Sequence, residues 1–138
     1  GMRIIVIDGQ GGGIGRSLTE KLRAELPEAE LVAVGTNSAA TANMMRAGAN
    51  VGATGENAVV FNCARTDVIV GPLGIILADA MLGEITPRMA CAVAASRAKK
   101  VLIPAAKQHM TIVGIEDLPL SRYIDEAVAC VRDFCGRD

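Results

Sequence analysis

Aromatic side chains are almost absent from this sequence, which has two Phe, one Tyr and no Trp among 138 residues. Proteins that bind single-stranded nucleic acids stack the bases on aromatic platforms. An excess of positive charge is absent too, since 14 Lys and Arg residues stand against 15 Asp and Glu residues. Nucleic acids and anionic membranes attract strongly basic surfaces. We therefore expect no nucleic-acid partner and no membrane partner.

No apolar run is long enough to cross a bilayer, which takes about 20 residues. The longest run, residues 68–83, is shorter and contains Pro72 and Asp79. No hydrophobic signal segment with a small-residue cleavage site precedes the first strand pattern. We therefore expect a cytoplasmic protein in which residues 2–138 form a single domain. Gly1, which precedes Met2, is expected to be the remnant of an expression tag.

The spacings of metal ligands are also missing. The four cysteines, at positions 63, 91, 130 and 135, form no Cys-x-x-Cys pair, and His109 is the only histidine. A structural zinc site takes four such ligands at closer spacings. We predict no metal site, and we expect the thiols to be reduced and buried.

What the sequence does contain is an alternation of strand and helix patterns. Apolar runs predict strands at residues 3–8, 30–36, 67–70, 101–104 and 111–115. Apolar spacing and capping residues, including Thr86 before Pro87, predict helices at residues 14–26, 38–48, 56–64, 73–82, 87–98 and 120–135. The alternation predicts an α/β fold: a three-layer, Rossmann-like open sheet of about five mostly parallel strands flanked by helices. Ligands of such folds bind at the carboxyl ends of the strands.

A glycine loop separates the first strand from the first helix. It reads Gly9-Gln10-Gly11-Gly12-Gly13-Ile14-Gly15. A tight turn needs one or two glycines, and each glycine costs about 0.5–1 kcal/mol relative to alanine. The excess favours a backbone that approaches a phosphate closely at the positive end of a helix, with Arg16 and Ser17 extending the anion site. The alternative is a glycine-rich turn without a ligand.

The loop matches two known phosphate motifs incompletely. Gly9-x-x-x-Gly13-x-Gly15 is similar to the cofactor loop of short-chain dehydrogenases, but their Tyr-x-x-x-Lys relay is missing around Tyr123. Residues 12–17 resemble the phosphate loop of NTPases, but Arg16 replaces its lysine. After the second strand stand Thr36, Asn37 and Ser38, with no carboxylate to hold a ribose hydroxyl. This pattern favours NADP over NAD, or else these three residues only cap a helix.

Further polar groups are expected at the same edge of the sheet. Asp8 ends the first strand, where it either hydrogen-bonds loop amides, contacts a ribose or holds a cation through water. Gly71 and Pro72 follow the third predicted strand and either wall a crevice or form a plain turn. The candidates for acid–base catalysis are Glu84, Lys107 and His109, for which a surface-loop role is the alternative.

One stretch is more apolar than a single sheet face usually requires. Its apolar residues are Ile75, Ile76, Leu77, Ala80, Met81 and Leu82. They predict either a homodimer that buries part of this stretch or complete burial within one subunit.

Four segments of the chain resemble a known family. They are Asp8-Gly9-Gln10-Gly11-Gly12-Gly13-Ile14-Gly15, Gly71-Pro72-Leu73-Gly74-Ile75-Ile76, Met81-Leu82-Gly83-Glu84-Ile85-Thr86-Pro87 and Leu102-Ile103-Pro104. The family consists of small bacterial proteins known only as a domain of unknown function. The resemblance covers nearly the whole chain and implies a Rossmann-like fold in a bacterial cytoplasm. It implies no activity and no functional residues.

The leading hypothesis from the sequence is a binding module. The glycine loop is expected to hold a nucleotide, a dinucleotide, with NADP favoured over NAD, or another phosphorylated small molecule. A small enzyme that acts on a phosphorylated substrate and a non-catalytic homo-oligomeric scaffold are the alternatives. No recognisable catalytic constellation is present, which ranks binding above catalysis and leaves open whether the protein is an enzyme.

Overall fold

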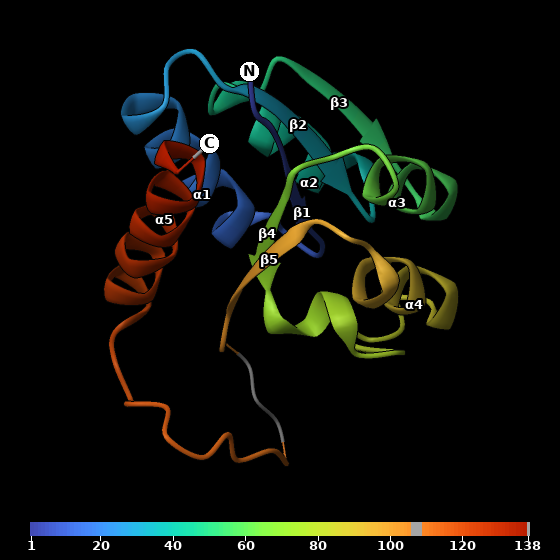
Figure 1. Cartoon of the computed structure of the whole chain (residues 1–138). Coiled ribbons are helices and arrows are strands. Elements are labelled where there is room, and N and C mark those ends of the chain that lie inside the picture. The colour runs from blue at the N-terminus through green and yellow to red at the C-terminus, as the bar shows by residue number, and fades with distance from the viewer. Residues whose placement is uncertain (106–108, 138) are drawn as a thin grey trace.

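In the part of the chain that is described, five parallel strands form one sheet with helices on both faces (Figure 1). The structure is a computed structural model, and it describes residues 1–105 and 109–137. The strands follow the order β3-β2-β1-β4-β5 across the sheet. They are β1 (Arg3–Asp8), β2 (Glu30–Gly35), β3 (Val51–Thr54), β4 (Val68–Pro72) and β5 (Lys99–Ile103).

The central strand β1 shows why this sequence forms a sheet. Its residues from Ile4 to Ile7 are fully buried. A parallel strand that is covered on both faces carries a continuous apolar run of this kind. In the register of the sheet, Ile5 lies between Val32 of β2 and Ile69 of β4. The apolar run at residues 3–8 therefore predicted this strand correctly.

Helices complete two outer layers. They are α1 (Gly13–Glu25), α2 (Ser38–Arg46), α3 (Glu56–Cys63), α4 (Pro87–Ala95) and α5 (Leu120–Gly136). Leu18, Met44 and Val131 of α1, α2 and α5 belong to the core on one face, and Val59 and Met89 of α3 and α4 to the core on the other. Figure 1 places α1 beside α5 and α3 beside α4. The predicted three-layer, Rossmann-like fold is confirmed.

The strand predictions were wrong in two places. Strand β3 was not predicted, because this short strand at the edge of the sheet contains Gly52 and leaves Val51 52% exposed. An edge strand needs no continuous apolar run. Residues 111–115 were predicted to form a strand and do not, because Gly114 has a left-handed φ of 85° within a turn. Val113 beside it is 95% exposed.

The helix predicted at residues 73–82 is also wrong. Only its first turn is helical, as the 3-10 turn η1 (Leu73–Ile76). Beyond it, Asp79, Met81 and Leu82 all have left-handed φ angles, between 56° and 68°. L-residues avoid a left-handed helix because the Cβ clashes with the following carbonyl oxygen. The chain therefore makes an irregular, strained turn between η1 and α4.

Helix α4 begins as predicted and ends early. Thr86 is its N-cap, with an Oγ1 that accepts from the amide three residues later at 3.2 Å, and Pro87 opens the first turn. The helix ends at Ala95 instead of Ala98, because Ser96 has an extended backbone. No helix in residues 1–105 and 109–137 is both long and apolar enough to span a membrane.

The apolar stretch offered above as a dimer surface is mostly packed within the subunit. Ile75 is fully buried. The half-buried members are Ile76, Leu77, Ala80 and Met81. Leu82, by contrast, is 97% exposed on the strained turn. Leu82 is thus the most exposed apolar side chain of this stretch.

The prediction of buried thiols holds for Cys63. Burial raises the pKa of its thiol to about 11, so this group stays protonated at neutral pH. Cys91 of α4 and Cys130 of α5 are exposed, so the prediction was wrong for both. Cys135 is half-buried.

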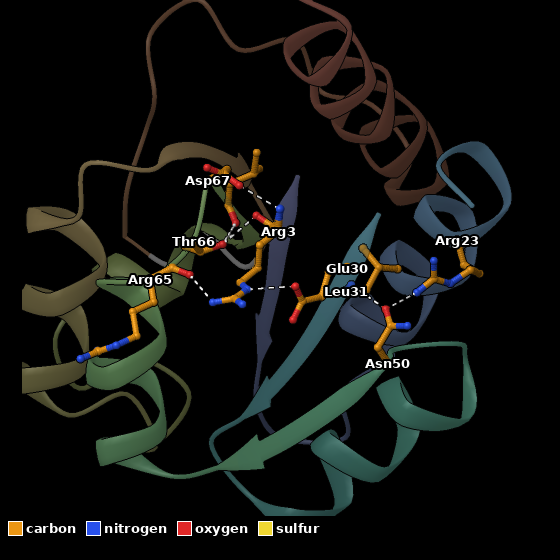
Figure 2. A network of polar contacts seen from close by, with 9 residues as sticks. Arg3, Arg23, Glu30, Leu31, Asn50, Arg65, Thr66 and Asp67 are labelled. Carbon is orange, nitrogen blue, oxygen red and sulfur yellow. Dashed lines mark hydrogen bonds and ion pairs between the residues drawn. The ribbon is translucent and has the colours of Figure 1, made fainter. Parts of the chain in front are cut away.

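Polar side chains link the strands at the amino-terminal end of the sheet (Figure 2). The amide of Arg3 donates to Oδ2 of Asp67 at 2.9 Å, and its guanidinium donates to the carbonyl of Arg65 at 3.0 Å. The same guanidinium lies 3.2 Å from Oε2 of Glu30. The hydroxyl of Thr66 donates to the carbonyl of Arg3 at 2.9 Å. These contacts connect β1 to the starts of β2 and β4.

Candidate functional site

The glycine loop lies at the opposite, carboxyl-terminal end of the sheet. It connects β1 to α1, next to the ends of β2 and β4. In the strand order β3-β2-β1-β4-β5, the chain leaves β1 towards one edge and later returns to β4 on the other side. Sheets of this kind bind ligands at such a reversal of strand order, at the carboxyl ends of the strands. The loop therefore lies where this fold places its ligands.

Asp8 holds the two ends of the glycine loop together. Its side chain is 4% exposed. Oδ1 accepts from the amide of Gly9 at 2.8 Å, and Oδ2 accepts from the amide of Gly15 at 2.6 Å. Burial raises the pKa of this carboxyl, and the bonds from Gly15 and Gly9 act in the opposite direction. Of the roles expected for Asp8, the geometry favours hydrogen bonding to loop amides.

Three of the five loop glycines are required by the fold. A Cβ on Gly9 would overlap the hydroxyl of Thr36, and one on Gly15 would lie 2.6 Å from the sulfur of Met44. Gly12 has a left-handed φ of 72°, and its Cβ would lie 2.8 Å from a backbone atom of Ala40. Packing and backbone conformation thus explain these three glycines without a ligand.

Gly11 and Gly13 have no such explanation. Neither has a left-handed φ, and a Cβ on either would meet no atom within 4 Å. Both residues are exposed. The amides of Gly11, Gly13 and Ile14 make no hydrogen bond to any described residue. Neither packing nor backbone conformation therefore requires a glycine at positions 11 and 13. Both residues lie at the positive end of α1, where the amides have no partner among the described residues.

A side chain from α2 fixes the outer part of the loop. Nδ2 of Asn43 donates to the carbonyl of Gly11 at 2.6 Å. The guanidinium of Arg46 donates in turn to Oδ1 of Asn43 at 2.6 Å. Asn43 could not be singled out from the sequence, because nothing in its local pattern distinguishes it from any polar helix residue. The contact is visible only once α2 is packed against α1.

Glu84 reaches the end of β2 from the turn before α4. Its Oε1 accepts from the hydroxyl of Thr36 at 2.7 Å, the amide of Gln10 at 2.8 Å and Nδ2 of Asn37 at 2.9 Å. The bond from Thr36 lowers the pKa of Glu84 most, followed by those from Gln10 and Asn37. The end of β2 therefore does have a carboxylate beside it. No carboxylate was expected there from the sequence, because Glu84 is 48 residues away from Thr36 along the chain.

The three polar residues after β2 have different environments. Asn37 is the N-cap of α2, since its Oδ1 accepts from the amide of Ala40 at 2.9 Å, and its Nδ2 also donates to the carbonyl of Gln10 at 2.9 Å. Thr36 is bonded to Glu84. Ser38 is exposed and has no hydrogen bond to a described residue. Asn37 therefore both caps α2 and contacts the glycine loop.

A cavity of about 430 Å³ lies on the β4 side of the loop. Its lining consists of Asp8, Gln10, Ile14, Pro72, Gly74, Leu77, Ala78, Asp79, Ala80, Met81, Leu82, Ala105, His109 and Met110. Pro72 therefore does wall a crevice. Gly71 is buried instead, where a Cβ would overlap the carbonyl of Ile7 in β1. The cavity volume is in the range of small-molecule sites.

The expected catalytic residues are not all brought together. His109 lines the cavity and is exposed, whereas Glu84 does not line it and contacts the β2 side of the loop. Lys107 lies outside the described residues. Arg16 is exposed and Ser17 half-buried, and neither side chain bonds to a described residue. Among the described residues, no three His, Cys, Asp or Glu side chains are grouped so that they could hold a metal ion.

Comparison with known proteins identifies a family but no activity. No curated protein matches the sequence. A crystal structure of a dodecameric FMN-dependent UbiX-like decarboxylase from Escherichia coli O157:H7 is similar at a TM-score of 0.49 and 17% sequence identity, over 98% of this chain and 94% of that one. At this level of similarity the comparison supports no statement about ligand or reaction. Residues 3–135 match the family described as Domain of unknown function (DUF3842), and the chain belongs to that family.

Proposed function

We propose that this protein binds a nucleotide or another phosphorylated small molecule on the glycine loop. The phosphate would lie on the amides of Gly11, Gly13 and Ile14. The observation that carries the proposal is that Gly11 and Gly13 are glycines with open space before them and no internal reason to be glycine. A phosphate held close to the backbone would supply that reason, since glycine lets a ligand approach the amides without a side chain in the way.

The electrostatics of the loop support an anion. The positive end of α1 attracts negative charge, and each amide bond to a charged group contributes about 1.5–3 kcal/mol. Arg16 follows one turn into the helix with no described partner, so its guanidinium is available to a phosphate. Both oxygens of Asp8 already accept amide bonds within the loop.

The cavity supports a ligand larger than phosphate. It begins at Gln10 and Ile14 of the loop and continues past Pro72 to His109. A molecule with its phosphate on the loop would have room for a further group there. On the β2 side, the carboxylate of Glu84 stands where the sequence analysis placed the 2′-phosphate of NADP. The proposal therefore covers nucleotides and dinucleotides without the preference for NADP.

The test is a ligand screen with a charge-reversing variant. Thermal shift and calorimetry would be run with ATP, ADP, AMP, NAD, NADP, FMN, coenzyme A and inorganic phosphate. Gly13→Asp places a carboxylate on the loop, at a helix start where an acid favours folding. Ser121→Asp makes the same charge change in the first turn of α5, at an exposed residue.

We expect at least one phosphate compound to bind the native protein and Ser121→Asp. For Gly13→Asp we expect affinity at least tenfold weaker, with a melting temperature no lower than that of the native protein. The proposal fails if the native protein binds none of these compounds, or if Gly13→Asp binds them equally well.

A second candidate function is catalysis on a phosphorylated substrate. It is favoured by His109, the only histidine, because this side chain and the carboxylate of Asp8 line the same cavity. An imidazole can donate or accept a proton near neutral pH. If this candidate is right, His109→Ala abolishes turnover of a bound compound and leaves its affinity within about threefold. Without turnover of any bound compound, this candidate is lost and binding remains.

A further inference from the structure

We infer that Glu84 is the residue that selects the sugar of the bound nucleotide, so that the site takes a ribose with a free 2′-hydroxyl in preference to one with a 2′-phosphate. The inference rests on the proposed function and goes beyond it, because it names the part of the ligand that the β2 side of the loop recognises. It also reverses the preference for NADP that the sequence favoured.

The two oxygens of Glu84 are in different situations. Oε1 is saturated by three donors, from Thr36, Gln10 and Asn37. No described residue donates to Oε2, and the side chain is only half-buried. One oxygen is therefore used to hold the carboxylate in place, and the other is left to accept a hydrogen bond from outside the protein. A sugar hydroxyl is a donor of the right kind.

The position of Glu84 fits a ribose. Strands β1 and β2 end level with each other, since Asp8 pairs with Gly35 in the register of the sheet. In dinucleotide-binding sheets with this strand order, a carboxylate near the end of β2 accepts from the ribose 2′-hydroxyl while the phosphates lie on the loop after β1. Here Gln10 belongs to the loop and also bonds to Glu84. If the phosphate of a ligand lies on the amides of Gly11 and Gly13, its ribose would have to extend only past Gln10 to reach Glu84.

The charges around Glu84 oppose a 2′-phosphate. Thr36, Gln10 and Asn37 all donate to the carboxylate and keep it ionised, and Asp8 adds a second acid close enough to interact with it. No ion pair among the described residues involves Glu84. Arg46 of α2 donates to Asn43, and the proposed function uses Arg16 for the phosphate on the loop. A 2′-phosphate beside Glu84 would therefore meet negative charge, and no described cation pairs with that carboxylate.

The turn that carries Glu84 is built to hold it. The amide of Glu84 donates to the carbonyl of Met81, and the amide of Ile85 to that of Ala80, both at 3.1 Å. Ile85 is fully buried in the core between the sheet and α4. The left-handed backbone of Met81 and its neighbours is the kind of strain that persists at functional sites.

The test compares three forms of one nucleotide by calorimetry. The probes are AMP, 2′-deoxy-AMP and adenosine 2′,5′-bisphosphate, and NAD against NADP repeats the comparison on a dinucleotide. The variant is Glu84→Gln, which keeps the shape and removes the charge. The matched control is Glu56→Gln, because Glu56 likewise accepts from a threonine hydroxyl, that of Thr86 at 2.7 Å, away from the loop.

We expect the native protein to bind AMP at least tenfold more tightly than 2′-deoxy-AMP and than the 2′,5′-bisphosphate. In Glu84→Gln we expect both affinity ratios to fall at least fivefold. We also expect this variant to bind the 2′-phosphate compounds more tightly than the native protein does. Glu56→Gln keeps the native ratios.

Two outcomes overturn this inference alone. In one, the native protein binds the three AMP forms equally or prefers the 2′-phosphate. In the other, Glu84→Gln folds normally and keeps the native ratios. If no phosphate compound binds at all, the proposed function is lost and this inference with it. The melting temperature of Glu84→Gln reports folding independently of affinity.

Discussion

The two ends of the sheet use their polar groups in different ways. At the amino-terminal end, Arg3, Asp67 and their neighbours bond to one another and to backbone groups (Figure 2). At the carboxyl-terminal end, the amides of Gly11 and Gly13 and one oxygen of Glu84 have no partner in the described residues. Exposed amides bond to water, and the first amides of any helix lack a partner within that helix, so these groups are free to accept another partner. The two ends of the sheet therefore differ in which polar groups remain available to a molecule from outside the protein.

The largest expected effect comes from Asp8, a buried carboxyl at the carboxyl-terminal end whose two oxygens both accept bonds within the loop. Asp8→Ala leaves the buried amides of Gly9 and Gly15 without acceptors. Each unsatisfied buried group costs about 1–3 kcal/mol. We expect the free energy of unfolding to fall by about 2–4 kcal/mol in a urea titration. Asp8→Asn keeps one acceptor oxygen and should lose less; equal losses would mean that these bonds do not stabilise the loop.

The amino-terminal end should affect stability without affecting binding. Oδ1 of Asn50 accepts from the amide of Leu31 at 2.8 Å and from Arg23 at 2.6 Å (Figure 2). Asn50→Ala should lower the free energy of unfolding by about 1–2 kcal/mol, because the Leu31 amide loses its acceptor. Ligand affinity, measured by calorimetry well below the melting temperature, should be unchanged. Weaker binding in this variant would contradict the separation of the two ends.

Substitution of Gly13, which packing does not require to be glycine, should weaken ligand binding without weakening the fold. Gly13→Ala fits the open space and reduces the freedom of the unfolded chain, so we expect stability to rise by about 0.4–1 kcal/mol. Phosphate ligands should bind more weakly. Gly136→Ala, at the open end of α5, is the matched control. It should stabilise the protein without changing affinity. If Gly13→Ala is destabilising, the fold itself needs this glycine and the argument from it fails.

The smallest effect is a difference in pH dependence between the two acids of the site. Glu84 has its pKa lowered from an ordinary value of 4.5, so its contribution to stability is present above that value and is lost as the pH falls through the folded pKa. Asp8 has its pKa raised from 3.8, so its contribution is present below that value and is lost as the pH rises through the folded pKa. On acidification the two contributions oppose each other.

Urea titrations between pH 3 and pH 7 would separate these contributions. Asp8→Asn removes the contribution that grows as the pH falls. The free energy of unfolding of this variant should therefore fall more steeply from pH 7 to pH 3 than that of the native protein. Glu84→Gln should fall less steeply. The same slope in all three proteins would mean that neither carboxyl changes its pKa on folding.

The predictable part of the fold was the part that is buried on both faces. The run from Ile4 to Ile7 carries its own signal, because a covered strand must be apolar throughout. Strand β3 carries none, since an exposed edge tolerates Gly52 and a half-exposed Val51. The strained turn after η1 could not be predicted either. Its apolar residues match a helix pattern, and only the tertiary structure imposes the left-handed angles.

The sequence predicted where the candidate site lies, but not how its residues are arranged. The excess of glycine located the loop, but the sequence could not separate Gly11 and Gly13 from the glycines that packing requires. That distinction depends on Thr36, Met44 and Ala40, which reach the loop from β2 and α2. The position of Glu84 depends on strand order, which a single sequence does not contain.

The bond from Gln10 to Glu84 joins residues that are 74 positions apart. This bond can form only after β2 and β4 have paired on either side of β1, because Glu84 follows β4 in the chain and is bonded to Thr36 at the end of β2. Contacts between distant parts of a chain form slowly, since they require long loops to be closed first. The β2 side of the site should therefore be assembled late in folding.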